Sequence, residues 1–144
     1  MTPAMTVRCI LAGMLGDVAD YRRLRALLEA QFSAALRHRA EEISDIVGRI
    51  VELTAVLERR RRERVELAGA LLAGKVPASR VSLQAVSERL PATARARFDD
   101  CCATLEALVT ECKRLNRRNC NLLTAQHDIM HRVLKTEAYI YAPA

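Results

Sequence analysis

The sequence predicts an all-α fold: a long antiparallel helical hairpin with a short intervening helix. Hydrophobic residues make up 51% of the 144 residues, yet aromatic residues make up only 3% and Trp is absent. A sheet would need more aromatic and β-branched residues. The chain is instead rich in Leu, Ala, Arg and Glu, which favour helices, and it contains only five Gly and four Pro. Apolar residues also recur at helical spacing along most of the chain.

A first long helix is predicted over residues 17–73. Its second half carries a seam whose members alternate three and four residues apart, the spacing of a heptad repeat. Arg60 and Arg64 are set into this otherwise apolar seam. Asp17 or Asp20 is a candidate N-cap, although the helix could begin upstream of both. The seam consists of Ile43, Ile46, Ile50, Leu53, Leu57, Arg60, Arg64, Leu67 and Leu71.

Two further helices follow a turn. The stretch "GKVPAS" (residues 74–79) is a turn by its Gly, Pro and Ser. A short helix is predicted over residues 82–90, with Ser82 as its N-cap. A second long helix is predicted over residues 93–136, followed by a short C-terminal tail. Residues 1–144 are therefore expected to form a single helical domain.

A broad apolar stripe runs along the helix predicted over residues 93–136, wide enough to contact more than one neighbour. Within this stripe, Asn116 and Asn119 are polar residues among apolar ones. Buried amides destabilise a fold unless their hydrogen bonds are met, and one use for them is to fix the register of packed helices. These two either align the helix against the first long helix or contact a helix from another chain. The three rows of the stripe, each with members seven apart, are Phe98, Leu105, Cys112, Asn119, Gln126 and Val133; Cys101, Leu108, Leu115, Leu122 and Ile129; and Cys102, Val109, Asn116, Leu123 and Met130.

Two alternatives to a helix-binding protein remain open, one suggested by the charge and the other by the heptad seams. The net charge is +6, and "ERRRRER" (residues 58–64) holds five arginines, which is compatible with a basic helical nucleic-acid-binding protein. Two glutamates dilute that cluster and no aromatic stacking residues lie nearby, which disfavours nucleic acid. The heptad seams are also compatible with a structural coiled-coil subunit. The seams suit a monomer and a homodimer equally.

No catalytic or metal site is predicted, and no cofactor. His127 and His131 are one helical turn apart, but Cys120 is too far along the same helix to join them, and "HDIMH" has Asp where zinc proteases have Glu. The five cysteines lie mostly on the apolar stripe, where a thiol behaves as a small hydrophobe. No Gly-rich phosphate loop is present. The protein is therefore not expected to be an enzyme.

The sequence also predicts a cytoplasmic protein without membrane insertion. Its N-terminal apolar run of roughly seven residues is at the lower limit for a signal peptide and lacks a clear cleavage site. No run approaches the roughly 18 apolar residues that span a bilayer. The odd number of cysteines, without regular spacing, favours reduced thiols.

Several stretches resemble FlgN-like flagellar export chaperones. "CKRLNRRNCNLL" (residues 112–123) resembles a family motif in which two Asn three residues apart precede Gly and an apolar pair; here Cys120 takes the place of the Gly. "IVGRIVELTAVLERRRRERVEL" (residues 46–67) is similar to the family's mid-helix segment. "YIYAPA" is similar to its closing segment, with Tyr141 at the tyrosine. The layout of long, short and long helices is similar as well.

The resemblance implies a cytoplasmic chaperone of type III protein export. Such proteins hold the C-terminal helical segments of the hook–filament junction (hook-associated) proteins, prevent their premature assembly and deliver them to the export apparatus. It also implies that Tyr141 docks to the flagellar export gate protein. The cargo-binding residues expected from the stripe and this motif are Leu115, Asn116, Asn119, Leu122, Leu123 and Ile129.

Overall fold

The structure, a computed structural model, describes the backbone of residues 1–141 and the side chains of residues 1–136. The described residues form helices joined by short turns and contain no strand, so the all-α prediction is confirmed. Its elements are α1 (Pro3–Leu36), α2 (Ala40–Leu72), the 3₁₀ helix η1 (Ala78–Arg80), α3 (Leu83–Ser87) and α4 (Ala92–Tyr141).

Helix α1 begins well before the predicted start. The side chain of Thr2 caps the helix by accepting a hydrogen bond of 3.2 Å from the backbone N–H of Met5. Pro3 occupies the first turn, where its missing N–H needs no partner. Asp17 and Asp20, the candidate N-caps, lie in the middle of α1 and serve another purpose described below.

The single helix predicted over residues 17–73 is two helices in the structure. His38 adopts a left-handed conformation, with φ of 54°. The backbone N–H of Arg39 donates to the carbonyl of Ala34, and that of His38 to the carbonyl of Ala35, both at 3.1 Å. These two bonds form a Schellman motif, which ends α1 and lets the chain reverse into α2. Glycine usually occupies the position of His38, so this turn has no glycine signal in the sequence.

In the second half of the chain, the observed helices are close to the predicted ones. Ser82 caps α3 by accepting a hydrogen bond of 3.1 Å from the N–H of Ala85, as expected. The short helix is briefer than predicted, and α4 continues through the predicted tail to Tyr141. At the end of α3 the guanidinium of Arg95 satisfies backbone carbonyls that the helix leaves unpaired, those of Ser87, Glu88 and Leu90.

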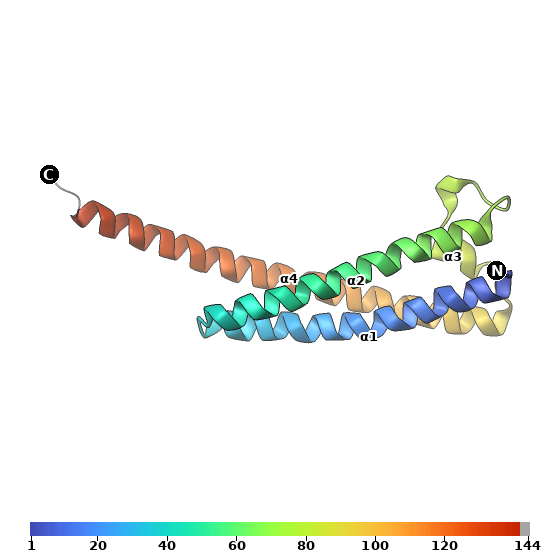
Figure 1. Cartoon of the computed structure of the whole chain (residues 1–144), viewed down its shortest axis with the longest axis horizontal. Helices are drawn as coiled ribbons and strands as arrows, with labels where there is room; N and C mark the ends of the chain where they lie inside the picture. The colour runs from blue at the N-terminus through green and yellow to red at the C-terminus, as the bar shows by residue number, and fades with distance from the viewer. Residues whose placement is uncertain (142–144) are drawn as a thin grey trace.

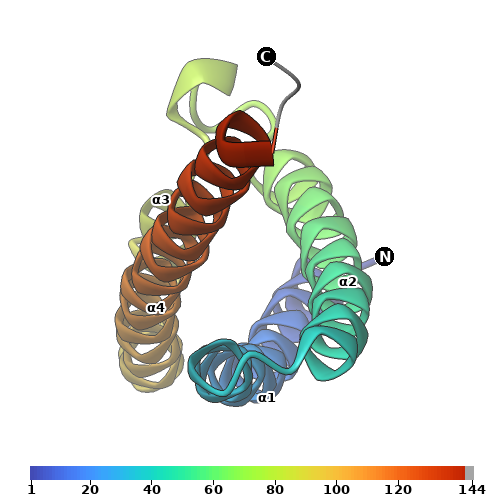
Figure 2. The same cartoon turned by 90° about the vertical axis from the view of Figure 1, so that its left-hand side faces the viewer.

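Helix α1 lies between α2 and α4 and packs against both. Helices α1 and α2 form an antiparallel hairpin, while α4 runs alongside α1 in the same direction (Figure 1). Within residues 1–141, α2 and α4 make no extensive contact with each other. In Figure 2 the two helices flank α1, with α4 on the left and α2 on the right. The short helix α3 contacts both α2 and α4 near the N-terminal end of the chain.

The apolar core is concentrated at the end of the bundle that holds α3. Here the beginning of α1, the end of α2, α3 and the beginning of α4 bury a common cluster around Phe98, which is 1% exposed. A smaller cluster follows toward the α1–α2 turn. It contains Leu24, Leu28, Leu57, Cys112 and Leu115. The bundle is therefore anchored at the α3 end and has a thinner core toward the turn.

A buried ionic network joins the middle of α1 to α2. Asp17 is 1% exposed and its carboxylate accepts from Arg60 at 3.2 Å and Arg64 at 2.7 Å. Arg60 also donates to Asp20 at 2.6 Å. The two arginines of the predicted seam thus find carboxylates on the neighbouring helix, as buried charges require. Gly16 leaves room for this contact, because a Cβ there would lie 3.3 Å from the Arg60 guanidinium.

Candidate helix-binding surface

Polar side chains of α4 bind backbone carbonyls of α1 at intervals of one heptad. The separation in sequence is 91 residues in every pair, so the two helices keep one parallel register over this length. A heptad spacing on both partners is the signature of coiled-coil packing. The donors and acceptors are Cys112 Sγ to Tyr21 O (3.5 Å), Asn119 Nδ2 to Leu28 O (2.7 Å) and Gln126 Nε2 to Ala35 O (2.9 Å).

Asn119 is the most buried member of this series, with an exposed fraction of 1%. Its amide nitrogen donates to the carbonyl of Leu28 and to Oε1 of Gln31 at 2.8 Å. Its amide oxygen accepts from the guanidinium of Arg118, whose carbon lies 3.7 Å from the centroid of the Phe32 ring. Of the two roles left open for this asparagine, the structure places it in the first, which is alignment of α4 against the first helix.

Replacement of Asn119 by Ala is expected to lower the free energy of unfolding by about 2 kcal/mol, since it leaves the buried side chain of Gln31 without a partner. Asn116→Ala is the matched control, because Asn116 is exposed, and its effect should stay within about 0.5 kcal/mol. Urea denaturation followed by helical circular dichroism measures both. Equal midpoints for the two variants would show that Asn119 does not fix the register.

The apolar stripe of α4 continues beyond the end of α1. Leu115 is fully buried, Leu122 is half-buried and Ile129 is 59% exposed, although the three lie seven residues apart on one side of the helix. Helix α1 ends at Leu36, and Gln126 makes the last hydrogen bond to it. We call the uncovered residues the exposed stripe of α4. They are Leu122, Leu123, Ile129, Met130, Val133 and Leu134.

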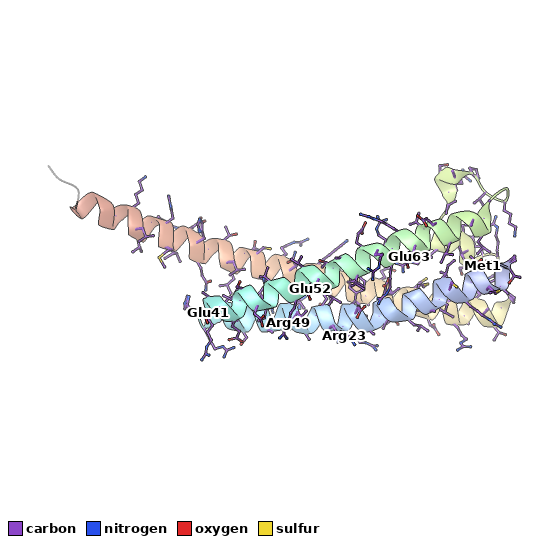
Figure 3. The ribbon with its side chains drawn as sticks, in the orientation of Figure 1. Met1, Arg23, Glu41, Arg49, Glu52 and Glu63 are labelled. Carbon is purple, nitrogen blue, oxygen red and sulfur yellow. The ribbon has the colours of Figure 1, made fainter. Side chains whose placement is uncertain are left out.

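The segment that carries most of this stripe projects from the bundle. Figure 1 shows the last part of α4 extending past the α1–α2 turn with no helix beside it. The side chains of residues 127–136 are all exposed, and Figure 3 shows them pointing outward around the ribbon. Four large apolar side chains lie close together here, each more than half exposed. A surface of this kind marks an interaction site more often than a solvated helix.

A cavity of about 350 Å³ lies between α2 and α4, upstream of the projecting segment. Helix α1 forms its floor, and α2 and α4 form its walls. Asn116 lines it from α4, and Leu123 and Met130 follow Asn116 at intervals of seven residues on the same side of the helix. The cavity and the exposed stripe are therefore on adjoining parts of one helix. The lining residues from α1 and α2 are Tyr21, Leu24, Leu28, Ile50 and Thr54.

The structure separates the six predicted cargo-binding residues into two groups. Leu115 and Asn119 are covered by α1. The other four are accessible on α4: Asn116, Leu122, Leu123 and Ile129. The side chain of Tyr141, the predicted docking residue, lies outside the described residues.

Three further residues belong to the exposed stripe and were not predicted as site residues. Met130 and Val133 stand in the heptad rows, so the repeat already contained the signal that could have found them. Leu134 lies next to that repeat.

The arginine cluster that suggested nucleic acid is largely engaged in ion pairs. Arg60 and Arg64 bind the carboxylates of α1 described above. Arg61 and Arg62 bind Glu58 at 2.8 and 3.3 Å, and the hydrogen bond from Arg61 is the main reason that the pKa of Glu58 falls to about 2. A phosphate backbone would have to compete with these carboxylates for four of the five arginines.

The thiols and imidazoles do not assemble into a reactive site in the described part of the chain. Burial raises the pKa of Cys101, Cys102 and Cys112, so these thiols stay protonated and unreactive near neutral pH. His127 and His131 stack on the exposed face of α4 with ring centroids 6.4 Å apart. Residues 1–136 contain no group of three or more side chains placed to hold a metal ion.

Comparison with known proteins gives one match. Residues 11–136 match the family model described as FlgN protein, which covers most of the chain. The comparisons with curated proteins and with solved structures found no match. Among the described residues, no helix combines the length and apolar character that a membrane crossing needs.

Proposed function

Because the chain belongs to the FlgN family and is therefore a flagellar export chaperone, we propose that it binds the C-terminal helical segments of hook–filament junction proteins. It keeps them unassembled in the cytoplasm and delivers them to the type III export apparatus. One observation carries the proposal, the exposed stripe of α4. A cargo helix must bury its apolar face against something until it assembles, and a matching helix face is a common way to do so.

Helix α1 indicates how a cargo helix would bind. It packs on the same rows of α4 that form the exposed stripe further along. Cys112, Asn119 and Gln126 contact α1, and Val133, the next residue of that row, has no helix beside it because α1 has ended. We expect a cargo helix to occupy this vacant place and extend the heptad packing. The cavity lined by Asn116 lies upstream of this place, on the adjoining part of α4.

The expected affinity follows from the area that such a helix covers. Each of the four most exposed apolar side chains of the stripe still presents more than half of its surface to water. Covering that remainder contributes about 1 kcal/mol per side chain. A cargo segment that is disordered when free must also be ordered, which subtracts from the total. The four side chains together contribute about 4 kcal/mol, which by itself corresponds to a dissociation constant on the order of millimolar, so tighter binding requires further contacts along the cargo segment.

The proposed activity is binding and release alone, without a cofactor or bond chemistry. Delivery would need a second contact, with the flagellar export gate protein. We propose Tyr141, the last residue of α4, for that contact. Phenolic side chains combine an apolar ring with a hydrogen-bonding group and are frequent in protein interfaces.

Titration calorimetry with the C-terminal fragment of a junction protein tests the proposal. We expect saturable binding accompanied by a gain of helical circular dichroism, because the fragment folds on the chaperone. A fragment from another part of the same junction protein is the control. Absence of binding, together with light scattering that shows a stable elongated oligomer, would favour the structural coiled-coil subunit instead.

A further inference from the structure

A second apolar cavity, of about 490 Å³, lies at the opposite end of the bundle from the exposed stripe. In Figure 3 this is the end that carries Met1, whereas Glu41 marks the α1–α2 turn. The cavity lies in the size range of about 300–1,000 Å³ that is typical of binding pockets. Its apolar lining comes from four segments of the chain and includes Val7, Leu11, Leu71, Val86, Leu90 and Ala94.

Four cationic side chains also line this cavity. Arg8 comes from α1, Lys75 follows α2, Arg89 follows α3 and Arg97 comes from α4. All four residues are exposed. Positive charge therefore reaches the cavity from every segment that builds it.

These four cations are free of carboxylates. The cavity lining contains no Asp or Glu. Every ion pair found among residues 1–136 involves other arginines. The contrast with Arg61 and Arg62, which share Glu58 on the surface, shows that this chain does neutralise arginines elsewhere. Here it keeps apolar surface and unpaired positive charge together.

We infer that this cavity is a docking site for an acidic amphipathic segment of a partner protein, separate from the cargo surface. A large apolar side chain of the partner enters the cavity, and carboxylates on either side of it meet the four cations. Complementary charge of this kind steers association and fixes the orientation of the bound segment. The partner is a third component, because the exposed stripe that serves the proposed cargo lies at the other end of the molecule.

The shape of the site favours a peptide over an anionic membrane. A bilayer surface would contact the cations but would leave a concave cavity between four chain segments unfilled. Membrane-surface binding instead uses a continuous apolar face of one helix. A protruding side chain with flanking carboxylates satisfies both the cavity and the charges. Anionic lipid is therefore the competing occupant that the test must exclude.

The test uses the whole chain and a synthetic helical peptide of about 18 residues, or five turns, with Leu on one face and Glu on the other. A second peptide carries Lys in place of Glu. Phosphatidylserine–phosphatidylcholine vesicles test the lipid alternative. The double variant Arg8→Glu with Arg97→Glu reverses two of the four cations, and Ala94→Trp fills the cavity while keeping all four. Arg22→Glu with Arg25→Glu is the matched control, since both lie exposed on α1 away from the cavity.

The acidic peptide should bind the wild-type chain and the control with equal affinity, and the affinity should fall as salt is added. Both Arg8→Glu with Arg97→Glu and Ala94→Trp should weaken it about tenfold or more. Binding of the junction-protein fragment should not change in either variant, which separates this site from the proposed cargo surface. Equal binding of the peptide to all variants, preference for the Lys peptide, or capture by vesicles without peptide binding would overturn the inference.

Discussion

Replacement of Asp17 by Asn is expected to lower the free energy of unfolding by about 3 kcal/mol, the low end of the range for breaking a buried ion pair. The substitution keeps the size of the side chain but removes the charge that pairs with Arg60 and Arg64. Arg64 is only 16% exposed at its side chain and would be left in the helix interface without a full counter-charge. The melting temperature should fall by about 10 °C.

Urea denaturation checks this expectation. Arg23→Gln is the matched control, because Arg23 binds Asp20 in the same network but its side chain is 74% exposed. Its loss should change the free energy of unfolding by less than about 0.5 kcal/mol. If Asp17→Asn were as mild as Arg23→Gln, the ionic network would not be what joins α1 to α2.

The double variant Ile129→Asp with Met130→Asp should weaken cargo binding about 100-fold or more while leaving the stability of the chaperone unchanged. Both side chains are more than half exposed and have no helix beside them in the free protein. In the proposed complex each lies under the cargo helix. The variant therefore loses about 2 kcal/mol of apolar burial and must also desolvate two carboxylates. Titration calorimetry with the junction-protein fragment gives the affinity.

The matched control for that variant is Leu15→Asp with Val65→Asp. These two residues are similarly exposed, at 57% and 54%, but lie on α1 and α2 rather than on the exposed stripe. The control should bind cargo as the wild type does. Loss of binding in both double variants would point to a general effect of added negative charge. Undiminished binding in Ile129→Asp with Met130→Asp would remove the stripe from the site.

The sequence predicted the helical class because periodicity and composition report directly on helix formation. Ser82 was found as a cap for the same reason, since a cap is a local signal. The end of α1 was missed because His38 adopts the left-handed conformation at a position that Gly usually occupies. A Gly there would have indicated the end of the helix. Because the break between α1 and α2 was not predicted, the sequence could not show that α4 runs parallel to α1.

The candidate site was predicted only in part, for a related reason. Heptad rows identify which side of α4 is apolar, but the length of α1 decides where that side becomes uncovered. Leu115 and Ile129 are equivalent in the repeat, yet one is buried against α1 and the other is exposed beyond it. For Asn119 the sequence left a contact with the first helix and a contact with another chain equally open, and its hydrogen-bond partners Leu28 and Gln31 lie on α1. The pairing of Asp17 with Arg64, 47 residues away, has no local signature at all.

Hydrogen exchange of the chaperone with and without the C-terminal fragment of a junction protein tests the central claim most directly. If the cargo helix packs on the exposed stripe of α4, amide protection should rise across residues 122–136, because packing suppresses opening of the projecting helix. The core at the α3 end should exchange unchanged. Protection confined to α2, or no change along α4 in a chaperone saturated with cargo, would contradict the account.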